Sequence, residues 1–182
     1  ENYHLLMCNS NEMYEREVKS VQTLLDARVC GILASMSKNT LEYRHFQNII
    51  DDDVHLVFFD RICPGINADK VVADDYRGAF TAVDYLAETG CSRIAFLGSD
   101  SHLPISNNRR MGYEDALRKH KLPVEKKWIK VCDTTALAQQ VVPQMLDEEN
   151  RPDAFFCIND EVAAYCLQIV KSAGFRVPEG IS

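Results

Sequence analysis

Short apolar runs alternate along this chain with segments in which apolar residues recur at helical spacing. The runs have the length of β-strands, and the segments between them have the period of helices that bury one face. Such repetition is typical of β–α units, in which a helix carries the chain back to the start of the next parallel strand. The alternation therefore predicts an α/β fold built on parallel sheets.

This period also places the individual elements. Strands are predicted at residues 4–8, 29–34, 54–59, 71–73, 93–97, 128–131 and 154–158. Helices are predicted at residues 11–28, 41–50, 76–89, 108–120, 136–149 and 161–173. Asn9 or Ser10 is placed to cap the first helix. Because the strands of the first half are almost wholly apolar, we expect them to be buried on both faces.

An irregular stretch with Pro64 and Gly65 interrupts the alternation between residues 60 and 70. We interpret it as a boundary and predict a first, N-terminal lobe over residues 1–72 and a second, C-terminal lobe over residues 73–182. Each lobe is expected to be a doubly wound parallel sheet flanked by helices. The chain starts almost directly in a strand and stops where another strand would follow, so we expect both lobes to be incomplete.

The composition bears on possible partners. The 182 residues include 27 acidic and 20 basic ones, which gives a net charge of −7, and the basic residues are scattered. A negative chain repels phosphate backbones, so this chain alone is not expected to hold DNA. No run of about 18 apolar residues is present, and the first ten residues lack the pattern of a secretion signal. We therefore expect no membrane span and no membrane partner.

Seven cysteines lie at positions 8, 30, 63, 91, 132, 157 and 166. They form no Cys-x-x-Cys pair, and the five histidines are not spaced beside them as zinc ligands are. An odd number of thiols, several of them inside apolar runs, fits packed free cysteines in a reducing cytosol. We predict a cytoplasmic protein with no metal site and no cofactor.

Small or polar residues follow nearly every predicted strand. In open parallel sheets, ligands bind beyond the carboxyl ends of the strands, so these residues are the first candidates for a site. They are Asn9, Ser10, Ser35, Asp60, Arg61, Gly98, Ser99, Asp100, Asp133, Thr134, Asn159 and Asp160. A Ser or Asn in such a place often only caps the next helix, and that alternative stays open for each residue taken singly. No helix is predicted directly after Asp60 and Arg61, which favours a binding role for this pair.

Signatures of catalysis are absent from the sequence. It has no glycine-rich dinucleotide or phosphate loop and no Gly-x-Ser-x-Gly nucleophile elbow. Asp60 has the position of a phospho-acceptor, but the metal-binding acidic pair that this chemistry needs does not follow the strand at residues 4–8. Arg61 beside Asp60 favours a charged carboxylate, which is a poor proton donor. We predict no catalytic residue and no enzymatic activity.

Five segments carry motifs in a fixed order. Residues 71–79 (VVADDYRGA) and 86–98 (LAETGCSRIAFLG) are similar to V-x-D-N-x-x-G-A and H-L-x-x-x-G-H-x-R-I-A-x-I-x-G. Residues 109–117 (RRMGYEDAL), 152–163 (PDAFFCINDEVA) and 29–33 (VCGIL) are similar to R-x-x-G-[YF]-x-x-A-L, P-D-A-[IV]-[FV]-x-x-N-D-x-x-A and V-D-G-I-I. In these motifs, and over essentially its whole length, the chain resembles the LacI/GalR family of bacterial transcriptional regulators.

The resemblance implies a two-lobed periplasmic-binding-protein-like fold that holds a small polar effector, such as a sugar, in the cleft between its lobes. It assigns ligand contacts to Ser35, Asp60, Arg109, Asn159 and Asp160. It further implies a homodimer, and DNA binding through an upstream helix-turn-helix headpiece that is absent from this chain. The expected partners are thus a small effector, a second subunit and, through the headpiece, DNA.

Several positions depart from the family pattern, among them Cys30, Cys91 and Ser92. Asp75 replaces the usual Asn, and Thr134 stands where many relatives place an aromatic ring against the ligand. The loss of that ring removes a stacking surface, so the family's usual ligand does not transfer to this chain, and Thr134 is a candidate ligand contact as a polar residue that follows a strand.

Three functions compete on this sequence. The favoured one is the sensor domain of a transcriptional repressor, in which ligand stabilises the closed lobes and the new lobe angle alters how two headpieces meet DNA. A solute-binding protein for a sugar transporter is the alternative, although seven free cysteines argue against an oxidising periplasm. A doubly wound enzyme is the third, and it lacks a visible nucleophile or acid–base pair.

Overall fold

The computed structural model describes residues 3–99 and 102–182. The chain divides into two compact units, the first ending at Ala73 and the second starting at Asp74. The boundary predicted from the sequence lies one residue earlier, after Val72. The assignment of the two units to the lobes of a two-lobed fold stays a proposal. Within the described residues, no helix has the length and apolar character needed to cross a bilayer.

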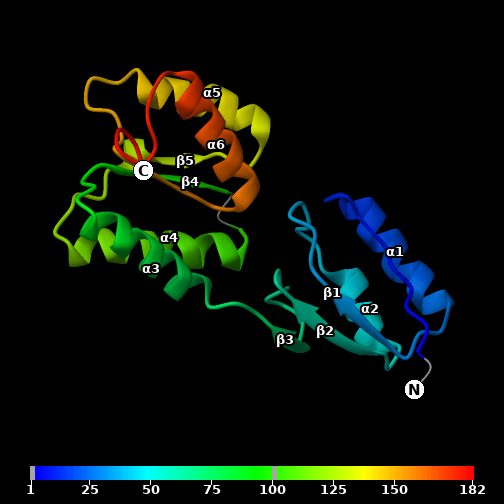
Figure 1. Ribbon diagram of the computed structural model, residues 1–182. Coiled ribbons are helices and arrows are strands. Elements are labelled where there is room, and N and C mark those ends of the chain that lie inside the picture. Colours follow the sequence, from blue (N-terminus) through cyan, green and yellow to red (C-terminus); the bar gives the residue numbers. More distant parts are fainter. Residues whose placement is uncertain (1–2, 100–101) are drawn as a thin grey trace. The chain divides into compact units, whose positions relative to one another are not determined.

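The first unit is a three-stranded parallel sheet with two helices (Figure 1). β1 (Gly31–Ala34), β2 (His55–Phe59) and β3 (Asp69–Val71) lie side by side in that order. The helices α1 (Tyr14–Asp26) and α2 (Arg44–Asp51) contact each other. The predicted β–α alternation is confirmed from β1 onward.

One face of this first sheet carries the core of the unit. Ile32, Leu56 and Phe58 are buried, whereas Leu33 and Phe59 on the other face are 72% and 47% exposed. The prediction that these strands are buried on both faces is therefore wrong for the first unit. The physical reason is that side chains along a strand point alternately to the two faces of the sheet. Both helices of residues 3–73 pack on one face, so every second side chain lies on a face that these residues leave exposed.

Residues 4–8 form no strand, which corrects the prediction made from their apolar character. A strand is stabilised by hydrogen bonds to a neighbour, and the described ladders of the first unit join only β1, β2 and β3. Leu5 and Met7 are 80% and 86% exposed, so no packing holds the segment in a sheet either.

The start of α1 also differs from the prediction. Asn11 and Glu12 have positive φ angles of 50° and 60°, which place a turn where a helix was expected. The helix begins at Tyr14 after Met13, and neither Asn9 nor Ser10 caps it with a side chain. The Asn9 side chain instead accepts a hydrogen bond from the Asn11 amide at 2.8 Å, closing the turn itself.

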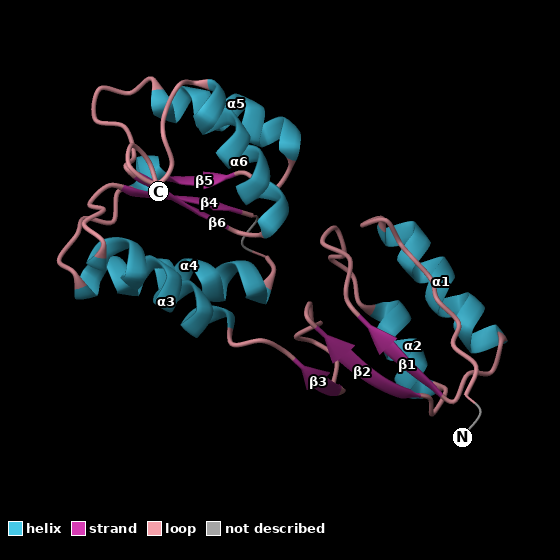
Figure 2. Cartoon of the chain, in the orientation of Figure 1, coloured by secondary structure: helices cyan, strands magenta, loops and turns pink. Residues whose placement is uncertain are grey.

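The second unit is a three-layer α/β structure (Figure 2). Its parallel sheet has the order β5 (Ile129–Val131), β4 (Ile94–Gly98), β6 (Ala154–Cys157). In Figure 1, α3 (Asp75–Glu88) and α4 (Pro104–Lys119) lie on one side of the sheet, and α5 (Thr135–Leu146) and α6 (Asp160–Ser172) lie on the other. A short 3₁₀ turn at Lys126–Trp128 precedes β5. This arrangement confirms the predicted doubly wound parallel sheet.

The core of the second unit is organised around the central strand. β4 is buried along its whole length because helices cover both faces of the sheet. The Phe96 ring of β4 stacks on Tyr113 of α4 and on Phe156 of β6, with centroid separations of 5.3 and 5.4 Å. The Tyr113 hydroxyl group donates to the Ile94 carbonyl oxygen at 2.8 Å, which satisfies the one polar atom that this ring brings into the core.

Candidate functional site

The topology of the second unit marks one place on its sheet. The chain leaves β4 toward β5 on one side and returns to β6 on the other. Where the strand order of a parallel sheet reverses in this way, a crevice opens beyond the carboxyl ends of the strands. Gly98 and Ser99 follow β4 there, and Asn159 follows β6. The candidate Asp100 lies outside the described residues.

Arg109 reaches this place from α4. The helix begins at Pro104 rather than at residue 108, so Arg109 lies in its second turn, and the prediction that it stands at a helix start is wrong. Proline suits the first turn because its fixed φ is helical and its missing N–H has no partner to lose there. Arg109 is thereby held on a formed helix.

The Arg109 guanidinium joins two elements. Its Nε and Nη2 lie 2.9 and 2.8 Å from one carboxylate oxygen of Asp75, at the start of α3. Its Nη1 donates to the carbonyl oxygen of Ile158, directly after β6. Three of the five N–H donors of the guanidinium are therefore engaged within the protein. The side chain is 26% exposed, and it is fixed in orientation at the end of β6.

Asn159, Asp160 and Thr134 lie at helix N-termini, where their side chains accept hydrogen bonds from backbone amides. The Asn159 side chain accepts from the Val162 amide at 2.9 Å, and the Asp160 side chain accepts from the Glu161 amide at 3.0 Å. The Thr134 hydroxyl oxygen accepts from the Leu137 amide at 3.3 Å. Asn159 and Thr134 are the N-cap residues of α6 and α5, so the capping alternative left open by the sequence describes these two, whereas Asp160 is the first residue of α6. Each keeps further donor or acceptor capacity at the carboxyl edge of the sheet.

In the first unit, the predicted residues lie at the ends of two neighbouring strands. Ser35 follows β1 and lines a pocket together with Cys8 and Ser10. Asp60 follows β2, is exposed and has a φ of 56°, while its amide donates to the Val71 carbonyl oxygen at 3.2 Å. The Asp60 side chain is 55% exposed, so its carboxylate is presented to solvent at the edge where the parallel strands end.

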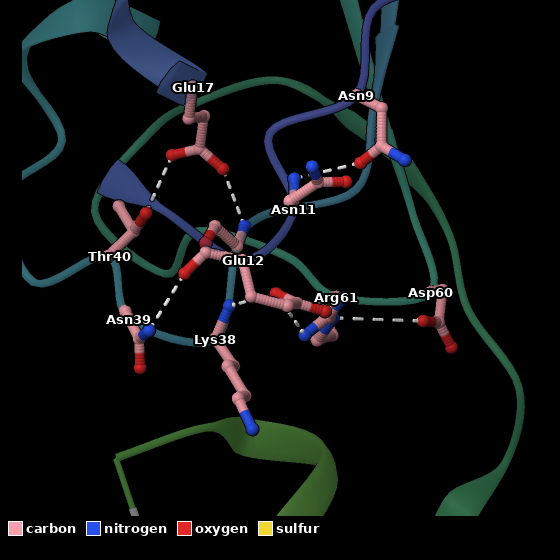
Figure 3. A network of polar contacts seen from close by, with 10 residues as sticks. Asn9, Asn11, Glu12, Glu17, Lys38, Asn39, Thr40, Asp60 and Arg61 are labelled. Carbon is pink, nitrogen blue, oxygen red and sulfur yellow. Dashed lines mark hydrogen bonds and ion pairs between the residues drawn. The ribbon is translucent and has the colours of Figure 1, made fainter. Parts of the chain in front are cut away.

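Arg61, the neighbour of Asp60, is held by a residue that the sequence did not suggest (Figure 3). Both Nη atoms of Arg61 donate to the Glu12 carboxylate, at 3.0 and 2.6 Å, and the Arg61 Nε lies 4.0 Å from Asp60. Burial alone would raise the pKa of Glu12, but hydrogen bonds from Arg61 and the Lys38 amide outweigh it and hold the pKa below its usual range. The ion pair fixes the loop that carries Asp60.

A second carboxylate lies deeper beneath this edge. Glu17 of α1 is 6% exposed and accepts hydrogen bonds from the Ser37 amide, the Thr40 hydroxyl group and His45 Nε2, at 2.5, 2.7 and 2.8 Å. Burial favours a raised pKa for Glu17, but these three donors prevail and lower it. The network anchors α1 to α2 and to the loop after β1. We interpret its role as structural, because Glu17 is buried and both of its carboxylate oxygens accept hydrogen bonds inside the protein.

Two further observations on the described residues bear on the site. Among residues 3–99 and 102–182, no three His, Cys, Asp or Glu side chains gather as metal ligands do. A pocket of about 180 Å³ lies beside β4 and β5, lined by Phe96, Gly98, Ser99, Ser106, Asn107, Arg110, Ile129, Lys130 and Val131. None of the six predicted ligand residues is among the described residues that line it.

Comparison with known proteins identifies the family. Residues 83–182 match the family model described as a periplasmic binding protein-like domain. The chain belongs to this family. The matched segment covers nearly all of the second unit, and it includes Arg109, Thr134, Asn159 and Asp160.

Relatives of this periplasmic-binding-protein-like domain include transcription regulators. It is 32% identical to the HTH-type transcriptional repressor PurR of Vibrio atlanticus, over 99% of this chain and 54% of that protein. It is 28% identical to a sugar-binding transcriptional regulator of the LacI family from Escherichia coli, solved in complex with phosphate, with a TM-score of 0.77 over 98% of this chain and 64% of that one. The predicted resemblance to LacI/GalR regulators is confirmed.

A more distant structure shares the fold. The transcription regulator CcpA of Lactococcus lactis superposes with a TM-score of 0.88 at 19% identity, over 99% of this chain and 65% of that one. The predicted periplasmic-binding-protein-like fold is thereby confirmed. The chain spans about half the length of the curated relatives that it matches.

Proposed function

We propose that this chain is the ligand-sensing domain of a longer, cytoplasmic transcription regulator. It binds a small polar effector, a sugar or sugar derivative, between its two lobes, and it catalyses no reaction. DNA binding belongs to a headpiece outside this chain, and the regulator acts as a homodimer. The domain has relatives named as transcriptional repressors and sugar-binding regulators, which supports this function over the transport alternative.

The placement of Arg109 carries the proposal. This forked donor lies beyond the carboxyl end of β6, which pairs with the central strand β4 where the strand order of the sheet reverses. Two of its five N–H donors remain after the bonds to Asp75 and Ile158 are counted. A polar ligand therefore meets an oriented donor whose rotamer is already fixed by the protein, which lowers the entropy cost of binding.

The other predicted residues supply the remaining polar groups. In the second unit, Asn159, Asp160 and Thr134 flank the end of β6 and the end of β5 with amide, carboxylate and hydroxyl groups. In the first unit, Ser35 and Asp60 offer a hydroxyl group and a carboxylate. Such groups pair well with the hydroxyl groups of a carbohydrate, each of which both donates and accepts. A ligand that contacts both lobes binds the closed arrangement more tightly than the open one. It therefore shifts the population toward the closed arrangement.

The test is a thermal-shift panel of sugars, sugar phosphates and nucleobases on the longer encoded protein, its Arg109→Ala variant and an Arg118→Ala control. Arg118 lies on the same helix, is 58% exposed and pairs with Glu114 and Asp115, so its loss removes the same charge elsewhere. A ligand at about 100 times its Kd should add about 2.7 kcal/mol of stability, a shift of several degrees. We expect the shift in the native protein and in Arg118→Ala, and its loss in Arg109→Ala. A compound that stabilises Arg109→Ala as strongly as the native protein would refute the assigned site.

A further inference from the structure

The charge of Arg109 is compensated within the protein. Two guanidinium nitrogens share one oxygen of Asp75, whose side chain is only 9% exposed. Charge-assisted hydrogen bonds of this kind are about twice as strong as neutral ones. Arg109 and Asp75 together thus carry no net charge, and the guanidinium keeps two N–H donors for a ligand. An arginine without such a carboxylate partner would carry an uncompensated positive charge that favours anions.

The chain segment that accepts from Arg109 runs on into acidic residues. The Ile158 carbonyl oxygen that accepts from Arg109 is followed two residues later by Asp160, and Asp160 and Glu161 form the acidic first turn of α6. Both side chains are exposed. An anionic ligand group that bonded to Arg109 would approach the Asp75 carboxylate, which lies within 2.9 Å of two guanidinium nitrogens, and like charges so close together repel.

The compensation depends on one position that departs from the motif. The motif that residues 71–79 resemble has Asn where this chain has Asp75. A carboxamide oxygen can accept the same hydrogen bonds, but it carries no charge and leaves the guanidinium uncompensated. The carboxylate at position 75 therefore adds a charge effect to a contact that Asn would make by hydrogen bonding alone.

We propose that Asp75 determines the class of effector that Arg109 accepts. It admits a neutral oxygen, such as a hydroxyl or carbonyl group, and rejects a phosphate or carboxylate group at that position. This inference rests on the proposed function and narrows it to an effector without an anionic group at Arg109. Asp75 acts through Arg109 and is a positioning and specificity residue.

Inorganic phosphate is the probe for this proposal, because it tests the charge of the site without knowledge of the effector. The readout is the side-chain Nε–H signal of Arg109 in ¹⁵N-labelled longer protein, titrated with phosphate at constant ionic strength. The variants are Asp75→Asn and Asp75→Ser, the second of which also suits the start of a helix. The control is Asp84→Asn, since Asp84 lies on the same helix but pairs with Lys119 and His120.

We expect phosphate to shift the Arg109 signal in both Asp75 variants with a Kd at least about tenfold lower than in the native protein and in Asp84→Asn. Equal phosphate affinity in native and Asp75→Asn proteins, or no phosphate response in either Asp75 variant, would overturn the proposal. Trp128, which is 2% exposed in the core of the second unit, reports by fluorescence that each variant is folded. Failure of the proposed function shows separately, as the absence of any neutral compound that shifts the Arg109 signal of the native protein.

Discussion

Gly112 of α4 lies against the backbone of Tyr76 in α3 so closely that a Cβ on Gly112 would stand 2.3 Å from the Tyr76 carbonyl oxygen. The same Cβ would lie 2.8 Å from the Phe80 amide nitrogen and 3.0 Å from the Ala79 Cβ. These atoms are main chain or short side chain, and they cannot rotate away. The closeness of α3 and α4, and with it the contact between Asp75 and Arg109, therefore depends on glycine at this position.

Gly112→Ala is expected to destabilise the second unit by about 2–3 kcal/mol, since the helices must separate to admit the methyl group. Urea denaturation followed by Trp128 fluorescence measures this, because the only tryptophan of the chain lies in that unit. Gly78→Ala is the matched control. Its Cβ meets no atom within 4 Å, so the better helix propensity of alanine should stabilise the unit by about 0.5–1 kcal/mol. Equal effects of the two substitutions would contradict the close approach.

Tyr113→Phe is expected to cost about 1–2 kcal/mol. The substitution keeps the stacked rings but removes the hydroxyl group that donates to the buried Ile94 carbonyl oxygen. The same fluorescence measurement applies, with Tyr85→Phe as the control because Tyr85 is 65% exposed. A Tyr113→Phe variant as stable as the native chain would show that the Ile94 carbonyl oxygen does not need this donor.

The first unit is expected to lose stability in acid through Glu17. Its pKa is lowered in the folded state, so the unfolded chain takes up the proton first, near the ordinary value of 4.5. Stability from this carboxylate is complete above that value and is lost as the pH falls through the lower folded pKa. Urea denaturation is followed at each pH by far-UV circular dichroism, which reports on both units, and by Trp128 fluorescence, which reports on the second unit. The part of the transition seen only by circular dichroism belongs to the first unit.

Two variants isolate this acid effect. Glu17→Gln should lower the free energy of unfolding of the first unit at pH 7 by about 3 kcal/mol, because buried donors lose an ionised acceptor. The free energy of unfolding of this variant should also fall less between pH 5 and pH 3 than that of the native chain. Glu15→Gln, an exposed change on the same helix, should leave both properties as they are. An unchanged stability of Glu17→Gln at pH 7 would mean that the buried network contributes nothing.

The seven free thiols are expected to differ in reactivity. Cys8 and Cys30 are exposed, whereas Cys132 and Cys166 are buried, and burial raises the pKa of Cys132 to about 11. The thiolate is the reactive form, so iodoacetamide at pH 8 should label Cys8 and Cys30 at least about tenfold faster than the buried pair. Peptide mass spectrometry over a time course gives the order of labelling. Early modification of Cys132 or Cys166 in the folded protein would contradict the burial described for the second unit.

The fold was largely predictable because its strongest signals are local. The spacing of apolar residues along the chain predicted all six α-helices of the described residues, and every strand, to within a few residues of their bounds. The segment at residues 4–8 was the exception, since its apolar letters resemble a strand but a strand also needs a neighbour that no local pattern specifies. The start of α4 was predictable in principle: Pro104 is a recognised first-turn residue, and that signal outweighs the weak period that follows it.

The candidate site was predictable only in part. Strand ends and motifs indicated Arg109 and Asp60, and capping preferences explain what Asn159 and Thr134 do. The residues that orient the two cations could not be predicted, because Asp75 lies 34 positions from Arg109 and Glu12 lies 49 positions from Arg61. Only tertiary structure brings such pairs together, although the Asp at position 75 was already a visible departure from the motif.

A crystal structure of the longer protein with the compound that gives the largest Arg109-dependent thermal shift tests the central claim most directly. The account predicts a neutral ligand oxygen within about 3.2 Å of an Arg109 nitrogen, with the bonds to Asp75 and Ile158 retained. It also predicts ligand contacts with Asn159 or Asp160. A ligand seated in the pocket beside β5, between Arg110 and Lys130, with no contact to Arg109, would contradict the assigned site.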